Sequence, residues 1–216
     1  MSNEENSCGG CSCRGDEKKA AVDPAYRRAL WIVVILNLGF GIVEAAGGFI
    51  AGSQALKADS LDFLGDGSIT LVGLLALSWA ERTRARVALA QGWFLAALGL
   101  GVIGSALARV LSAGVPEAEW MGGLGAAGLL VHIAAAASLM GVREGGDAKA
   151  KAIWLFSRND AIANVAVMVA AAMVYWLESA WPDLVVAGVI AALFLHSARE
   201  IIRDARAELR DGRVSR

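Results

Sequence analysis

Five acidic side chains lie inside stretches of the chain that are otherwise apolar. Asp62 and Asp66 are four residues apart, so on a helix they share one face about one turn apart. Asp160 and Asn164 repeat this spacing later in the chain. Carboxylate and amide oxygens bind divalent cations, hard or borderline. The two pairs predict one metal site, provided that the segments carrying them pack face to face. The five acids are Glu44, Asp59, Asp62, Asp66 and Asp160.

Glu44 and Asp59 lie beside this predicted site and are not expected to be its ligands. We assign both to a proton or access pathway. For Asp59, on a flank of the Asp62–Asp66 face, this means an outer vestibule, with helix capping as the alternative. For Glu44 the alternative is a structural hydrogen bond. His132 is a lone imidazole among Ala and Leu, and we favour a packing role for it over contact with a metal.

The three cysteines, Cys8, Cys11 and Cys13, fall in one run, SCGGCSC, near the start of the chain. Three thiolates are enough to hold a soft metal such as zinc or cadmium. We predict an accessory metal-capture site there, and the alternative is a disordered tail with incidental thiols.

The amino-acid composition indicates the class of protein to which these residues belong. It has 216 residues, of which 56% are hydrophobic and 19% charged, a net charge of −1 and a mean hydropathy of +0.53. Soluble domains are about 45–50% apolar and about 25% charged. The chain is therefore too apolar for an ordinary soluble or disordered protein. The near-zero net charge also argues against a nucleic-acid partner.

Six apolar stretches approach the length of about 20 residues that crosses a bilayer. We therefore predict an all-α membrane protein with six transmembrane helices. The second and fifth stretches contain acids and the sixth is short, so a strict hydropathy criterion would score these three lower. The connecting links are short, which makes successive helices antiparallel. The predicted spans are Ala29–Ala51, Ala55–Ala80, Ala88–Ser112, Trp120–Val142, Ile153–Leu177 and Asp183–Ser197.

The basic residues predict the orientation, since cytoplasmic loops are enriched in Lys and Arg. Of the 20 basic residues, 17 fall on one side of the predicted spans. Both termini are therefore expected in the cytoplasm, with the chain in the cell (inner) membrane. The first 28 residues are polar and do not resemble a signal peptide. We divide the chain into a disordered Cys-containing tail (1–28), a transport domain (29–197) and a short charged tail (198–216).

Around the acidic residues of the second and fifth predicted spans, the chain resembles the cation diffusion facilitator family of divalent-metal/proton antiporters. The run SQALKADSLDFLGD (Ser53–Asp66) is similar to the second-helix signature of that family, which places Asp62 and Asp66 on its two transport-site positions. The run FSRNDAIANVAV (Phe156–Val167) is similar to the fifth-helix segment, with Asp160 on the aspartate position. The resemblance covers about residues 29–210 and implies a homodimer.

The chain also departs from the family pattern. Asp62 stands where zinc-transporting members commonly have His, which makes the predicted site richer in oxygen. Phe156 occupies another His/Asp position and offers no ligand atom, so Asn164, Asn159 or water must complete the shell. Only about 18 residues follow the last predicted span, so we do not expect the cytoplasmic C-terminal domain of many members.

Together these features predict a transporter rather than an enzyme. No nucleophile–base pair, HExxH motif or phosphate-binding loop is present. We expect export of a divalent transition metal from the cytoplasm in exchange for protons, with zinc first and cadmium, cobalt, iron or manganese as other cargoes. The predicted ligands are Asp62, Asp66, Asp160 and Asn164. The metal is cargo, and no cofactor is expected. The alternative function is a non-transporting membrane metal sensor or partner subunit.

Overall fold

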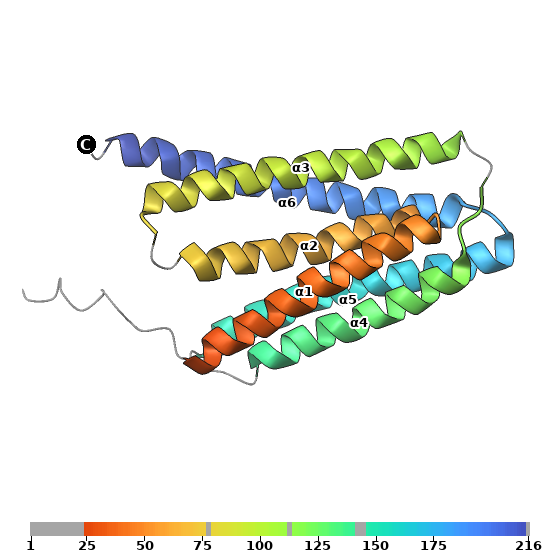
Figure 1. The fold of residues 1–216 in the computed structure, drawn as a ribbon, viewed down its shortest axis with the longest axis horizontal. Helices are drawn as coiled ribbons and strands as arrows, with labels where there is room; N and C mark the ends of the chain where they lie inside the picture. Colours follow the sequence, from red (N-terminus) through yellow and green to blue (C-terminus); the bar gives the residue numbers. More distant parts are fainter. Residues whose placement is uncertain (1–23, 77–78, 112–113, 141–145, 215–216) are drawn as a thin grey trace, which may run out of the picture.

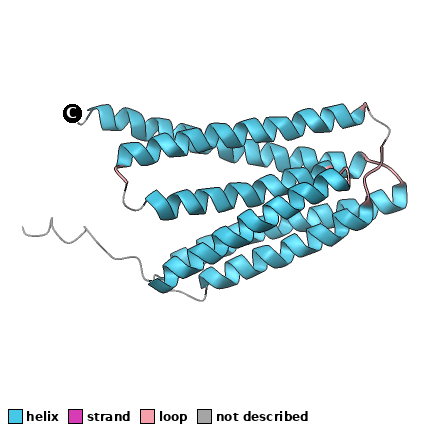
Figure 2. Ribbon diagram, viewed as in Figure 1, coloured by secondary structure: helices cyan, strands magenta, loops and turns pink. Residues whose placement is uncertain are grey.

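The computed structural model describes residues 24–76, 79–111, 114–140 and 146–214, and it describes the side chains of these residues except 146–159 and 211–214. Within those ranges the chain forms six helices and no strand (Figure 2), which confirms the predicted all-α class. The cysteine run lies outside the described residues. The helices are α1 (Pro24–Ile50), α2 (Gln54–Leu75), α3 (Glu81–Val110), α4 (Ala118–Met140), α5 (Gly146–Leu177) and α6 (Trp181–Val214).

Three predicted bounds are wrong. The predicted link before the third span is helical, because α3 begins at Glu81. The second helix ends at Leu75 and not at Ala80. The predicted link before the fifth span is helical from Gly146, where α5 begins. Helix α6 continues without a break from its apolar span through the charged tail to Val214. Charged residues such as Glu, Lys and Arg are good helix formers, so α3, α5 and α6 continue past their apolar stretches.

Five of the described helices are long and apolar enough to cross a membrane, and α2 is not among them. The reason is composition, because the 22 residues of α2 include Lys57, Asp59, Asp62 and Asp66. The expected low score of the second span is confirmed. The fifth and sixth spans score higher than expected, since Asp160–Leu177 and Trp181–Arg210 both reach a mean hydropathy of 1.7.

The helices form a four-helix group with a helix pair beside it (Figure 1). In the group, α1 packs mainly on α2, and α4 packs mainly on α5. The pair consists of α3 and α6, which lie side by side. The most central helix is α2, since it contacts every other helix. The start of α1 and the end of α6 lie at the same end of the bundle. Helix α2 is therefore placed to present side chains to the interior of the bundle along its length.

Small residues bring α1 and α2 together. The turn between them includes Gly52, whose φ of +65° lies in the left-handed region that favours glycine. A side chain there would also meet the guanidinium of Arg109. Further along, a Cβ on Gly67 would come within 2.7 Å of Leu38. These glycines let the two backbones approach closely, as is common in membrane helix pairs.

The first turn of α2 is held by a carboxylate from the start of α6. Asp183 is 1% exposed and accepts hydrogen bonds from Ser53 Oγ (2.6 Å), the Gln54 amide (2.8 Å) and the Ala55 amide (2.9 Å). Ser53 is also the N-cap of α2 and accepts a bond from the Leu56 amide. A negative charge at a helix N-terminus satisfies amides that have no partner within the helix. We call this group, Asp183 with Ser53, Gln54 and Ala55, the α2–α6 clamp.

The outward surface of the bundle is strongly apolar. Large side chains such as Phe49, Leu107 and Trp176 are 72%, 65% and 78% exposed. A soluble monomer rarely exposes so much contiguous apolar surface. The arrangement is that of a multi-pass membrane protein, in which these side chains face lipid.

Candidate metal centre

The carboxylates of Asp62, Asp66 and Asp160 converge at one point inside the bundle. One ligand oxygen from each lies within 4.8 Å of the other two, and all three residues are partly buried. Asp62 and Asp66 come from α2 and Asp160 from α5, so the two helices face each other as their spacing predicts. In the described part of the chain no Lys or Arg side chain forms a salt bridge with any of the three.

The separations suit a divalent cation. Two ligand atoms bound to one tetrahedral metal at about 2.1 Å lie about 3.4 Å apart. Three oxygens within 4.8 Å therefore need only small side-chain rotations to close on an ion. Without a cation, three carboxylates so close together repel one another, and their ionised forms are unfavourable. The arrangement can alternate between holding a metal ion and holding protons.

Asn164 is fully buried on α5, one turn from Asp160. Its Nδ2 donates to the backbone carbonyl of Asp160 at 3.1 Å. Its Oδ1 lies against Gly128 of α4 and has no hydrogen-bond partner among the described residues. An unpaired buried carbonyl oxygen is costly, so this atom is free to accept a ligand. A role as metal ligand stays a prediction.

His132 of α4 is the neighbour that the sequence did not indicate. Its Nδ1 lies 3.7 Å from Oδ2 of Asp160, and the residue is 4% exposed. Its ring also stacks on Phe63 of α2, with ring centroids 4.0 Å apart. The predicted packing role is thus found, but the imidazole packs directly beside the carboxylates. Little in the sequence signals this, because α4 is apolar on all sides apart from His132.

Glu44 and Asp59 form a second acidic pair, about one helical turn from Asp62 along α2. Both residues are 0% exposed, and none of their four carboxyl oxygens meets an N–H or O–H donor among the described residues, but the two carboxyl groups lie close enough to hydrogen-bond to each other. Glu44, on α1, lies close enough to Asp59 and Asp62 to interact with them electrostatically. The N-cap of α2 is Ser53, so the capping alternative for Asp59 is wrong, and its place beside an outer vestibule stays a prediction. Its role in a proton pathway stays a prediction.

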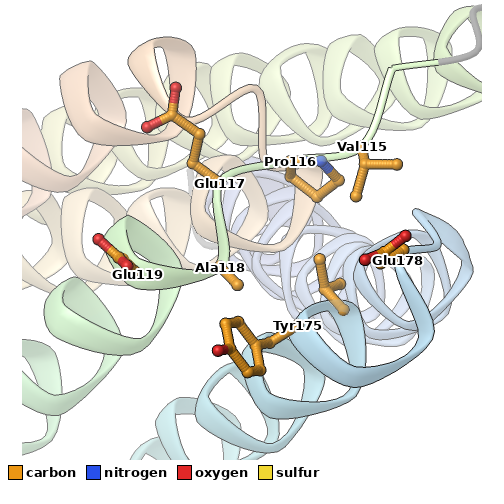
Figure 3. A pocket seen from close by; sticks show the side chains of 8 residues that line it. Val115, Pro116, Glu117, Ala118, Glu119, Tyr175 and Glu178 are labelled. Carbon is orange, nitrogen blue, oxygen red and sulfur yellow. The ribbon is translucent and has the colours of Figure 1, made fainter.

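A separate hollow of about 580 Å³ opens where the α3–α4 link meets the end of α5 (Figure 3). Glu117, Glu119 and Glu178 line it, but Glu117 and Glu119 point away from each other. The only acidic cluster with metal-binding spacing in the described residues is Asp62–Asp66–Asp160. The side chains of Phe156 and Asn159, at the predicted fifth-helix positions, lie outside the described part.

The chain matches the family model of the cation efflux transmembrane domain over residues 30–210. The chain belongs to the cation diffusion facilitator family. This match confirms the family that was predicted from the two acidic motifs. Members of this family are transporters rather than enzymes, and the family assignment agrees with a multi-pass membrane protein.

Among the curated proteins that this facilitator matches are transporters named for zinc and related metals. It is 29% identical over 203 residues to the zinc transporter ZitB of Escherichia coli, covering 88% of this chain and 64% of ZitB. It is 26% identical over 204 residues to a cadmium, cobalt and zinc/H(+)-K(+) antiporter of Bacillus subtilis, covering 87% of this chain and 65% of that protein. The chain thus spans a little under two thirds of these relatives.

Proposed function

We propose that this facilitator exports a divalent transition metal from the cytoplasm in exchange for protons. Zinc is the first choice of cargo, and cadmium, cobalt, iron and manganese are the others. Asp62, Asp66 and Asp160 bind the ion together with Asn164. The observation that carries the proposal is the convergence of three carboxylates between α2 and α5, with no Lys or Arg of the described side chains paired to them.

The proposed topology has six membrane-crossing helices, both termini in the cytoplasm and the chain in the cell (inner) membrane. Helix α2 crosses as well, because it is surrounded by the other five. The orientation is supported by Arg82 and Arg86 at the start of α3, which line one hollow of about 310 Å³ with Arg206 and Arg210 of α6. Clustered basic residues at one end of a bundle favour the cytoplasmic side.

In the proposed cycle the metal ion enters from the cytoplasm. Carboxylate oxygens then replace some of the water molecules bound to the ion. Rocking of the bundle then opens the site outward, where protons compete for the same oxygens and displace the ion. Each elementary charge that crosses 100 mV changes the free energy by about 2.3 kcal/mol. Inward movement of protons therefore helps to drive a cation out.

Proton flux in proteoliposomes tests this function. The full chain is reconstituted with a pH dye inside, and zinc is added outside. We expect zinc-driven proton flux that is lost in Asp62→Asn, Asp66→Asn and Asp160→Asn but kept in Asp204→Asn. Asp204 is the matched control, because it is a 68% exposed aspartate on α6. Unchanged flux in all three site variants would overturn the proposal.

The alternative is a membrane metal sensor or partner subunit that binds zinc without moving it. The three acidic residues serve either function, so binding alone does not separate them. Growth of a zinc-sensitive host does, because only a transporter raises the zinc concentration that the host tolerates. Binding without tolerance or flux would favour the sensor. The family resemblance supports a homodimer, and crosslinking in membranes tests it.

A further inference from the structure

The imidazole of His132 lies in a place where a packing role alone does not account for it. It is 4% exposed in the middle of α4, and its Nε2 has no hydrogen-bond partner among the described residues. A buried polar group without a partner is destabilising. Leu or Met would fill the same volume against Phe63 without this cost. Nδ1 forms no hydrogen bond among the described residues either, because Oδ2 of Asp160 is 3.7 Å away, so one ring nitrogen is open to a partner that these residues do not supply.

The position of Nδ1 indicates that this partner is a metal ion. Nδ1 of His132 lies 3.7 Å from Oδ2 of Asp160. This separation is too long for a hydrogen bond, for which N–O distances are about 2.7–3.2 Å. It is close to the spacing of about 3.4 Å between a nitrogen and an oxygen bound to one tetrahedral metal ion. Phe63 stacks on the ring and limits its rotation, so Nδ1 stays turned toward Asp160. The imidazole lies outside the 4.8 Å cluster of Asp62, Asp66 and Asp160, so the side chains must close on the ion for it to bind.

We propose that His132 is a ligand of the transported metal, on the Asp160 side of the site. The site is then built by three helices: α2 gives Asp62 and Asp66, α5 gives Asp160, and α4 gives a nitrogen. The proposal rests on the proposed function, because it assigns a further ligand to the same site. It also names the class of cargo more narrowly.

A nitrogen ligand changes selectivity. Imidazole suits zinc, cobalt and copper, whereas sites built only from carboxylate, carbonyl and water suit magnesium, calcium and manganese. With His132 bound, the oxygen-rich site becomes a mixed one that favours zinc and cobalt over manganese. His132→Ala is therefore expected to weaken zinc binding by at least about 10- to 100-fold, because that range is already seen when only a hydrogen-bond partner of a metal ligand is removed. Manganese binding is expected to change much less.

X-ray absorption at the zinc edge tests the ligand directly. The full chain is purified in detergent with Cys8, Cys11 and Cys13 changed to Ser, so that no thiolate binds zinc. One equivalent of zinc is added, and imidazole multiple scattering is measured. The matched control is His196→Gln, because His196 is the only other histidine and is 68% exposed on α6. Zinc and manganese affinities are measured by titration on the same samples.

We expect the imidazole signal in the parent protein and in the His196→Gln control, and its loss in His132→Gln and His132→Ala. A zinc spectrum with oxygen ligands alone in the parent overturns the inference, even if zinc affinity falls in the variants. That result would make His132 a positioning residue. If the parent transports zinc, such a spectrum leaves the proposed function intact. If it neither binds nor transports zinc, both proposals fail.

Discussion

Removing the carboxylate of Asp183 should destabilise the whole bundle, because it connects α6 to the first turn of α2. In Asp183→Ala, Ser53 Oγ and the amides of Gln54 and Ala55 all lose their acceptor in a site that water does not reach. A hydrogen bond to a charged group contributes about 1.5–3 kcal/mol, so three set an upper bound of about 4.5–9 kcal/mol. The burial of the charge offsets part of this. Breaking a buried charged network costs about 3–5 kcal/mol.

Asp183→Asn should have a smaller effect. Its one carbonyl oxygen still accepts from the α2 amides, but its NH₂ group faces donors. We expect about half the loss in the free energy of unfolding that Ala causes.

Thermal unfolding in detergent, followed by tryptophan fluorescence, measures these effects. For a chain of this length a loss of 1 kcal/mol lowers Tm by about 2–4 °C, so the Ala variant should unfold about 6–20 °C lower. Asp204→Ala is the control, since it removes an exposed carboxylate from the same helix. If Asp183→Ala unfolds within about 2 °C of the parent, the α2–α6 clamp does not hold the bundle together and the reasoning is wrong.

Three further predictions concern the site. Gly128→Ala puts a methyl group where Asn164 Oδ1 lies, so the zinc affinity measured by titration should fall several-fold. Gly123 has open space around it, so the control Gly123→Ala should leave the zinc affinity unchanged. Equal zinc affinities in the two variants would exclude the Asn164 amide oxygen as a ligand. Glu44→Gln should slow zinc-driven proton flux but keep zinc affinity, and a variant with normal flux would remove that acid from the proton pathway. Phe63→Leu removes the ring that stacks on the His132 imidazole, an aromatic contact that contributes about 0.5–1.5 kcal/mol. The freed imidazole should lower the zinc affinity measured by titration several-fold. Unchanged zinc affinity would mean that Phe63 does not orient the imidazole.

The acidic core of the site was predictable because its signals are local. The four-residue spacing of Asp62 and Asp66 places them on one helix face, and short links make the α2 and α5 segments antiparallel. Charges inside an apolar stretch are also rare enough to be informative one by one. These facts predict the convergence of Asp160 with the α2 pair only if α2 and α5 pack face to face, and the structure shows that they do.

The position of His132 was not predictable, because it depends on how α4 is rotated about its axis. A helix that is apolar on all sides gives no stripe from which to read that rotation. The contact between Asp183 and the first turn of α2 spans about 130 residues, and no local pattern marks its partner. The apolar stretch Asp183–Ser197 does not give the length of α6, because hydropathy reports where the membrane ends and not where the helix ends.

The composition of α2 has a consequence for how the chain enters the membrane. An aspartate at the centre of a helix disfavours insertion by about 2.5–3.5 kcal/mol, so the three in α2 make its insertion alone unfavourable. Helix α1 has a mean hydropathy of 2.1 and is joined to α2 by a turn of three residues. The two should therefore leave the translocon together as one hairpin, with Glu44 and Asp59 shielded between them. The aspartates of the proposed metal site thus make the membrane insertion of α2 dependent on α1.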